Sequence, residues 1–362
     1  MPECIVVGGG VIGLLTARAL YKAGVDVLLL ERGVLGGEST WAGGGIISPL
    51  YPWRYADAVN RLAERSKQIY PQLIPALYEE SGIDSELLNS GLFVLAHEGI
   101  DAIQQWGERW SINMEYVSDH RRVRELEPQV AENVAEGIWL PDIMQVRNPK
   151  LARAFKGSFD ALGIAYREHC PVSEIIVSGS KVTGVRTDAG ILNTDRVVIA
   201  SGAWSARFAP AKKSVAVLPV KGQMIMYKGE PGLLRRMVLS EGHYVIPRKD
   251  GHILAGSTLE KIGFDKTISS EALGELQQAA NTLIPALAGL PVARQWAGLR
   301  PGTENGIPYI CRHDELEGLY IHAGHYRNGI VLGAASAELM AALVLERETE
   351  IELAPYAINA MH

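Results

Sequence analysis

The sequence predicts a mixed fold, in which an α/β part of Rossmann type is interleaved with an α+β part rich in antiparallel strands. Residues 4–31 read as strand, glycine-rich turn, helix and strand, which is a complete βαβ unit. Short apolar segments at 90–96, 137–142 and 215–260 read as strands of a second, mostly antiparallel sheet. The apolar strand 197–200 is expected to rejoin the first sheet, so the chain visits each part more than once.

Composition narrows the classes of function. The chain has 362 residues and a formal net charge of -6, which gives no broad basic surface for a nucleic-acid backbone. Its three cysteines, Cys4, Cys170 and Cys311, are far apart and odd in number. They indicate neither a disulfide framework nor a metal site, and a reducing, cytoplasmic compartment fits them best. We therefore expect no nucleic acid and no metal.

No export signal or membrane span is expected. Met1 leads through two residues into an apolar strand, without a basic start or a cleavable apolar segment. The apolar stretch 330–345 contains Glu338, is rich in Gly and Ala, and falls short of the roughly 20 residues that span a bilayer. It reads as a buried helix.

The glycines of the N-terminal unit have distinct predicted tasks. Gly8 permits the tight turn, Gly10 leaves room for a pyrophosphate, and Gly13 lets helix and strand approach. Glu31 closes the second strand, where it would accept hydrogen bonds from a ribose. A bare GxGxxG also occurs in turns without a ligand, but this context favours a dinucleotide. The predicted contacts are Gly8, Gly10, Val11, Ile12, Gly13, Glu31 and Arg32.

A second glycine-rich stretch follows at 36–45. Five glycines bracket Ser39 and Thr40 there, and such a loop can wrap a flat ligand closely. The alternative is a surface loop without a ligand. The predicted contacts are Ser39, Thr40, Gly43, Gly44 and Gly45.

The rest of the chain divides into alternating pieces. Helices are expected at 57–80, from 149 onward and at 269–287, with short strands between 172 and 199. The predicted nucleotide-binding domain comprises 1–85, 146–214 and 298–362. The predicted substrate-binding domain comprises 86–145 and 215–297.

Six segments in order along the chain carry a family resemblance: VVGGGVIG at 6–13, STWAGGGI at 39–46, PVKGQM at 219–224, GHYVIPR at 242–248, WAGLRPGT at 296–303 and AGHYRNGI at 323–330. With them the sequence resembles the D-amino-acid oxidase superfamily of flavoproteins, and within it most closely the glycine oxidases. The resemblance implies a FAD-binding, Rossmann-like domain interleaved with a mostly antiparallel substrate domain.

The resemblance also implies where the flavin binds. The helix after AGHYRNGI would point its N-terminus at the pyrimidine edge of the ring, with backbone N–H groups near Asn328, Gly329 and Ile330. Further contacts are expected at Val172 and Gly202, and from Arg300 and Arg327. The related sarcosine oxidases bind flavin through a cysteine shortly after the arginine that matches Arg300. The stretch 301–310 has no cysteine, so non-covalent FAD is expected, and Cys311 reads as a buried apolar residue.

The catalytic residues implied by the resemblance are Arg300, Tyr244 and Arg327. Arg300 would bind the substrate carboxylate, Tyr244 would lie beside it, and Arg327 would stand at the mouth of the site. Without the family, Arg300 reads as a salt-bridged structural arginine and Tyr244 as a half-buried strand residue. Leu259 stands where glycine oxidases often carry methionine, and we expect Leu259 and Tyr244 to form the pocket wall. Acid–base roles for His243 and His325 are left open.

The implied activity is the oxidation of glycine, other small amines or D-amino acids. Substrate and O₂ would give a 2-oxo acid, ammonia and hydrogen peroxide, and the imine could serve thiamine thiazole synthesis. One alternative is a D-amino-acid dehydrogenase that passes electrons to a quinone or carrier. A second is a non-catalytic FAD-binding protein, and a nicotinamide dehydrogenase is disfavoured because no second nucleotide fingerprint is present. A homo-oligomer is left open by the sequence.

Overall fold

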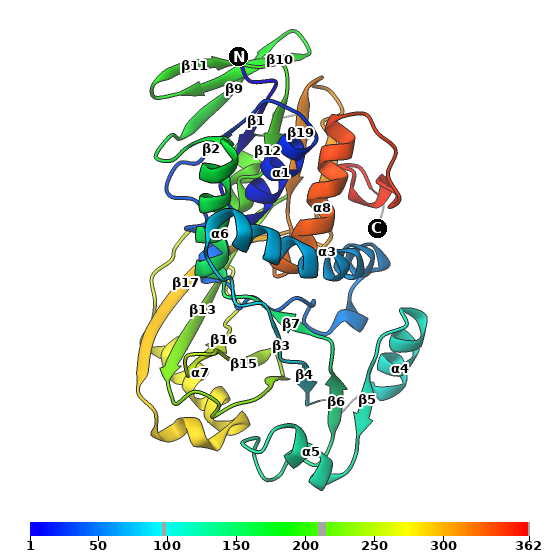
Figure 1. The fold of residues 1–362 in the computed structure, drawn as a ribbon, viewed down its shortest axis with the longest axis vertical. Coiled ribbons are helices and arrows are strands. Elements are labelled where there is room, and N and C mark those ends of the chain that lie inside the picture. Colours follow the sequence, from blue (N-terminus) through cyan, green and yellow to red (C-terminus); the bar gives the residue numbers. More distant parts are fainter. Residues whose placement is uncertain (96–98, 209–214, 361–362) are drawn as a thin grey trace.

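A parallel sheet forms the upper half of the molecule (Figure 1). The computed structural model describes residues 1–95, 99–208 and 215–360. In the six-stranded sheet, in the order β18-β19-β12-β1-β2-β8, all neighbours are parallel except β18 and β19. The strands are β1 (Cys4–Val7), β2 (Val27–Leu30), β8 (Ala165–Arg167), β12 (Val197–Ile199), β18 (Tyr309–Arg312) and β19 (Leu319–Ala323).

Both faces of this sheet are covered, because successive residues of its strands alternate between two cores. Cys4 and Val6 pack with the helices, whereas Ile5 and Val7 pack toward an antiparallel three-stranded sheet. The helices are α1 (Val11–Lys22), α3 (Asp57–Ser81), α6 (Asn148–Leu162) and α8 (Gly329–Val344). The three-stranded sheet consists of β9 (Val172–Ser178), β10 (Lys181–Thr187) and β11 (Gly190–Asn193).

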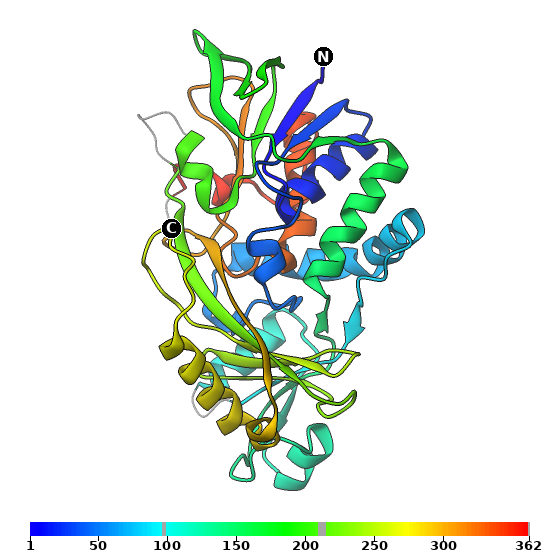
Figure 2. The ribbon, with the colours of Figure 1, turned by 90° about the vertical axis from the view of Figure 1, so that its left-hand side faces the viewer.

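An eight-stranded sheet forms the lower half, in the order β17-β13-β16-β15-β14-β4-β6-β5. It is antiparallel except where β14 pairs with β4. Its long strands β13 and β17 reach up toward the parallel sheet (Figure 2). The strands are β4 (Leu92–Val94), β5 (Glu115–Val117), β6 (Gly137–Leu140), β13 (Leu218–Lys228), β14 (Met237–Ser240), β15 (His243–Pro247), β16 (His252–Gly256) and β17 (Val292–Gly302).

Three helices and a small two-stranded sheet accompany the lower sheet. The side chains of α7 (Ser270–Leu283) contribute Leu276, Ala280 and Leu283 to one of its cores. The helices α4 (Ile100–Arg109) and α5 (His120–Leu126) follow β4 and β5. The strands β3 (Leu88–Asn89) and β7 (Met144–Gln145) pair with each other.

The predicted fold class is confirmed, with local differences. The stretch 36–45, predicted as a loop, contains the one-turn helix α2 (Ser39–Ala42). The helix predicted at 269–287 ends at Leu283, because Pro285 disfavours a helical conformation at Ile284, and a 3-10 turn (Pro285–Gly289) follows. Strand β17 runs across the predicted domain boundary at 297/298, and the domain limits stay a prediction. Residue 96 of the predicted strand and residues 209–214 lie outside the described residues.

Candidate active site

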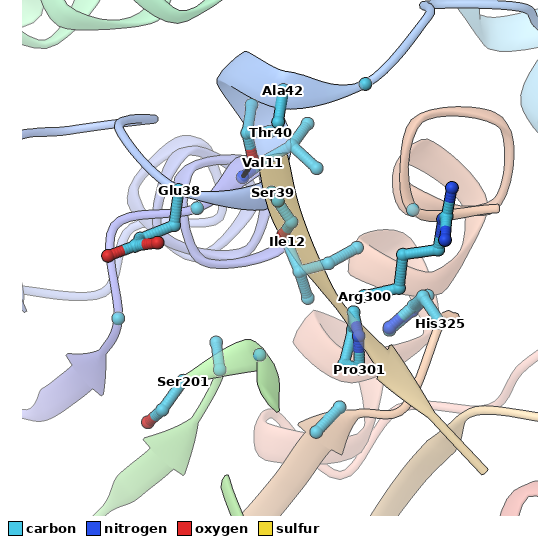
Figure 3. Close-up of a pocket in the computed structure, with 18 of the residues that line it drawn as sticks. Val11, Ile12, Glu38, Ser39, Thr40, Ala42, Ser201, Arg300, Pro301 and His325 are labelled. Atoms are coloured by element: carbon cyan, nitrogen blue, oxygen red, sulfur yellow. Dashed lines mark hydrogen bonds between the residues drawn. The ribbon is translucent and has the colours of Figure 1, made fainter. Parts of the chain in front are cut away.

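A cavity of about 410 Å³ lies where the two halves meet. Its lining includes Val7 and Ala200, at the carboxyl ends of the adjacent parallel strands β1 and β12. The sheet extends in opposite directions from this pair, and ligands of open α/β sheets bind at such a point. Figure 3 shows Val11, Thr40, Arg300 and Pro301 around this cavity, although they come from distant parts of the chain.

The turn between β1 and α1 requires glycine at two positions. Gly8 has φ +113°, and a Cβ there would lie 2.5 Å from the carbonyl oxygen of Ala200. A Cβ on Gly13 would lie 1.9 Å from the carbonyl oxygen of Gly8. Gly13 therefore permits helix and strand to touch, and it does not line the cavity.

The N-terminus of α1 opens into the cavity. Gly10, Val11 and Ile12 line it, the N-cap residue Gly10 has no side chain to cap the helix, and the first turn has no acidic residue. The backbone N–H of Val11 donates to Thr40 Oγ1 at 2.8 Å, which fixes Thr40 against the helix. Unpaired N–H groups and the helix dipole at this end favour an anion.

Glu31 lies at the cavity wall with its carboxylate held by the backbone. Its Oε2 accepts from Gly9 N at 2.6 Å, and its Oε1 accepts from Gly33 N at 2.7 Å. Each carboxylate oxygen has a further lone pair, so a ribose hydroxyl can still be bound. Arg32, Val172 and Gly202 also line this end of the cavity.

The glycine-rich segment 43–45 is held against the cavity by buried polar groups. Arg248 donates to the carbonyl oxygens of Gly44 at 2.8 Å and Val146 at 3.0 Å, and Asn148 Nδ2 donates to that of Thr40 at 2.7 Å. Burial lowers the pKa of Arg248 to about 10. Ser39, Thr40, Gly43, Gly44 and Gly45 all line the cavity.

Arg300 is a partly buried cation at the cavity wall. Its Nη1 donates to the carbonyl oxygens of Lys221 at 3.2 Å and Thr258 at 3.1 Å, and its Nη2 donates to Ser257 Oγ at 2.7 Å. Burial is the main cause that lowers its pKa, and nearby Arg327 lowers it further. Within the described ranges no carboxylate forms an ion pair with Arg300, so the reading as a salt-bridged structural arginine does not hold here. A desolvated cation without a counter-ion favours an anionic ligand.

Tyr244 lies on the same wall of the cavity as Met224. It is buried, and its hydroxyl contacts Met224 Sδ at 3.7 Å. Gly222 and Met224 alternate along β13 and both line the cavity, as residues two apart on a strand share a face. Leu259 is 51% exposed and does not line the cavity, so our expectation that it forms the pocket wall is wrong. Met224 takes that place.

The C-terminal segment brings Arg327 to the same cavity. The backbone N–H of Tyr326 donates to the carbonyl oxygen of Pro301 at 2.8 Å, which fixes the turn next to Arg300. Arg327, Gly329 and Ile330 line the cavity at the start of α8. Asn328 is buried behind this lining, and its Nδ2 has no hydrogen-bond partner in the part of the chain that the structure describes.

Two buried histidines line the cavity near α8, each in hydrogen-bond contact with a hydroxyl group. His325 Nε2 lies 3.0 Å from Ser336 Oγ. His322 Nδ1 lies 2.8 Å from Thr16 Oγ1. Burial lowers the pKa of His325 to about 3 and holds that of His322 well below its usual range.

Neutral His325 has no imidazolium proton to give near pH 7. His243, the other histidine considered for acid–base chemistry, does not line the cavity, and its Nε2 lies 3.3 Å from Glu275 Oε1. Of these two histidines, only His325 lines the cavity, and it is neutral there.

The chain matches the family model described as FAD dependent oxidoreductase over residues 3–343. It belongs to this family. It is 44% identical to the glycine oxidase of Pseudomonas aeruginosa over 98% of this chain and 97% of that protein. It is 43% identical to the glycine oxidase of Pseudomonas putida over 98% of each chain. The crystal structure of the glycine oxidase from Geobacillus kaustophilus superposes with a TM-score of 0.94 at 32% identity, covering 100% of this chain and 99% of that one.

The residues of this FAD-dependent oxidoreductase fit its cofactor. The start of α1 would hold the pyrophosphate, and the space in front of Gly10 is free except for Thr40 Oγ1, 3.4 Å from a Cβ there. Glu31 would hold the ribose, and the start of α8 would face the flavin. The individual contact assignments stay predictions.

Sequence reasoning missed several lining residues. The alternation of β13 could have identified Met224 from the PVKGQM motif, whereas Asn148 and Trp204 come from segments without a nucleotide signature. The additional lining residues include Ser48, Leu50, Asn148, Trp204, Arg207, Phe208, Met224, His322 and Tyr326.

Other kinds of site find no support in the residues that the structure describes. No group of three His, Cys, Asp or Glu side chains there could hold a metal ion. None of the helices in these ranges is long and apolar enough to cross a bilayer. The three cysteines are free, and none lines the cavity. Burial raises the pKa of Cys311 to about 12, which leaves it an unreactive thiol.

Proposed function

We propose that this FAD-dependent oxidoreductase is a glycine oxidase that acts on glycine and other small amines or D-amino acids. The observation that carries the proposal is Arg300, a partly buried guanidinium at the cavity without a carboxylate partner among the described residues. Its fork can bind an amino-acid carboxylate through two charge-assisted hydrogen bonds. The glycine oxidases among the relatives support the same activity.

The chain's own residues would orient the substrate. Arg300 binds the carboxylate, and the neighbouring charge of Arg327 adds attraction for an anion at the cavity mouth. Tyr244 and Met224 close the space next to the carboxylate and limit the size of the side chain that Cα can carry. Arg300 would fix the carboxylate on one side, and Tyr244 and Met224 would restrict the space on the other. Together they determine which face of Cα is turned toward the flavin site.

Bound FAD would supply the oxidation, as an acceptor of two electrons from the substrate that O₂ reoxidises. The overall reaction balances when glycine, O₂ and water give glyoxylate, ammonia and hydrogen peroxide. No protein nucleophile is needed, and an uncharged substrate amine provides the electron pair that assists hydride loss.

The stoichiometry of peroxide tests this reaction. With glycine in air-saturated buffer, we expect one hydrogen peroxide for each glyoxylate, measured by a peroxidase-coupled assay and by hydrazone formation. A reference sample with catalase should keep its glyoxylate yield and lose its peroxide. Glyoxylate formed without peroxide, and only with an added quinone, would instead indicate the dehydrogenase. No glyoxylate under either condition, in protein that carries FAD, would indicate the non-catalytic alternative.

We also infer that FAD is bound non-covalently, since no cysteine lines the cavity in the described ranges. Precipitation of the holoprotein with acid should release intact FAD into the supernatant. Yellow colour that stays with the washed precipitate would contradict the inference. A homo-oligomer, a cytoplasmic location and a link to thiamine thiazole synthesis remain predictions.

A further inference from the structure

The segment 257–269, between β16 and α7, is anchored at both ends beside the cavity. At its start, Ser257 Oγ and the Thr258 carbonyl accept hydrogen bonds from Arg300. Glu260 pairs through its backbone with Lys221, and Lys221 Nζ also donates to the carbonyl oxygen of Thr267 at 2.5 Å. The residues between these anchors, 261–266, form an exposed tip.

Two side chains of this tip reach across to the upper half of the molecule. The ring of Phe264 lies 5.4 Å from that of Trp204, and the guanidinium carbon of Arg207 lies 5.0 Å from the Phe264 ring. Lys266 Nζ lies 2.9 Å from Glu38 Oε2. The contacts therefore join a segment of the lower half to the 3-10 turn Gly202–Phe208 and to the start of α2.

The partners of the tip belong to the cavity wall. Trp204, Arg207 and Glu38 line the cavity, whereas Phe264 and Lys266 do not. The wall residues also hold one another: the guanidinium carbon of Arg32 lies 3.6 Å from the Trp204 ring centroid, and Arg32 Nη2 lies 2.8 Å from Glu38 Oε1. This group stands next to Glu31 at the end of β2, which is the predicted ribose end of the FAD site.

We propose that Phe264 and Lys266 are positioning residues that retain FAD by holding this wall closed. Phe264 keeps Trp204 and Arg207 in place by packing, and Lys266 keeps Glu38 in place by charge. Each contact is modest and partly exposed, so the tip can open without unfolding either sheet. Opening would release Trp204, Arg32 and Glu38 together, because Arg32 contacts both Trp204 and Glu38.

The rate of FAD release tests the proposal. Holoprotein is mixed with an excess of a flavin-scavenging apoprotein, and loss of the bound flavin spectrum gives the rate. Phe264→Ala should release FAD about five- to tenfold faster, and Lys266→Ala about two- to fivefold faster, the losses expected for an aromatic contact and an exposed ion pair. Phe264→Tyr should restore the slow rate, because its ring can pack on Trp204 in the same way.

Matched controls come from the same tip. Ile262→Ala and Lys261→Ala change an exposed apolar and an exposed basic residue of the same tip that do not line the cavity, and they should release FAD at the wild-type rate. Thermal unfolding of each apoprotein separates a lost wall contact from a misfolded segment. Rising salt should accelerate release less in Lys266→Ala than in wild type, because the variant lacks one of the two exposed ion pairs of Glu38.

A double-mutant cycle examines the contact itself. If Phe264 acts through Trp204, Trp204→Ala combined with Phe264→Ala should release FAD no faster than Trp204→Ala alone. Wild-type release rates in both Phe264→Ala and Lys266→Ala, or equal acceleration in Ile262→Ala, would overturn the proposal.

Discussion

The guanidinium of Arg300 lies directly against the backbone of Gly222, in the space that a side chain at 222 would fill. A Cβ on Gly222 would lie 2.1 Å from Arg300 Nη2 and 2.3 Å from its Cζ. The two residues belong to the paired strands β13 and β17, where Val220 opposes Arg300 and Gly222 opposes Gly298. The register of this pair therefore sets where the cation stands.

We predict that Gly222→Ala displaces Arg300 and weakens substrate binding while FAD stays bound. The added methyl group overlaps the guanidinium, so the arginine must leave its hydrogen bonds to Ser257 and Thr258. KM for glycine should rise by about tenfold or more, since a misplaced charged partner costs at least ~1.4 kcal/mol. Steady-state kinetics measures this. Gly274→Ala, where a Cβ meets nothing within 4 Å, is the control.

The pocket wall gives a second prediction. Wild type should oxidise glycine, sarcosine and small D-amino acids ahead of D-phenylalanine and L-alanine, because Tyr244 and Met224 limit the space. Met224→Ala removes part of the wall and should raise kcat/KM for larger D-amino acids relative to glycine. Leu259→Ala should leave this preference unchanged, since Leu259 is exposed outside the cavity. A shift in preference with Leu259→Ala and none with Met224→Ala would reverse the assignment.

The nucleotide end gives a third prediction. Gly10→Val should yield protein without FAD, because the side chain would occupy the space in front of the N-terminus of α1. Glu31→Arg should do the same by removing the ribose acceptor and the partner of the Gly9 and Gly33 N–H groups. The ratio of absorbance at 450 and 280 nm, about zero for both variants, measures this loss. Glu108→Arg, an exposed change on α4, should keep full flavin content.

Sequence patterns predict the parts of the site that local rules govern. The turn glycines Gly8 and Gly13 follow from the βαβ pattern, since backbone contacts of the turn exclude a side chain there. Asn148 and Trp204 depend on how distant helices and turns meet, which no local pattern encodes, whereas Met224 follows from the alternation of β13. Leu259 is the opposite case: the family resemblance predicted a wall residue, but its side chain is exposed outside the cavity.

Burial of His325 predicts a pH dependence of stability. Its folded pKa of about 3 lies below the unfolded value of about 6.5, so the unfolded chain binds more protons between these values. The contribution of neutral His325 to the free energy of unfolding is therefore lost as pH falls below about 6.5. Between pH 7.5 and 5, the decrease in the free energy of unfolding should be about 2 kcal/mol smaller in His325→Gln than in wild type. Urea unfolding at the two pH values measures this decrease. The exposed change His120→Gln should retain the wild-type slope; a wild-type slope in His325→Gln would contradict the neutral, buried state.

The role of Arg300 as the carboxylate anchor is the central claim. Arg300→Ala should retain FAD but lose roughly 2 to 4 kcal/mol of productive binding, the cost of stripping the partner from a buried carboxylate. At low glycine, the slope of the flavin-reduction rate constant plotted against glycine concentration should therefore fall by about 30- to 1,000-fold. Amines without a carboxylate should be affected far less. Arg294→Ala, on the same strand but outside the cavity lining, is the matched control.

The most direct measurement is anaerobic stopped-flow reduction of the bound flavin by glycine in wild type, Arg300→Ala and Arg294→Ala. We predict rapid bleaching of the flavin in wild type and Arg294→Ala. In Arg300→Ala, the slope of the reduction rate constant against glycine concentration should be lower by about 30-fold or more. An Arg300→Ala protein that bleaches as fast as wild type at low glycine would contradict the carboxylate anchor.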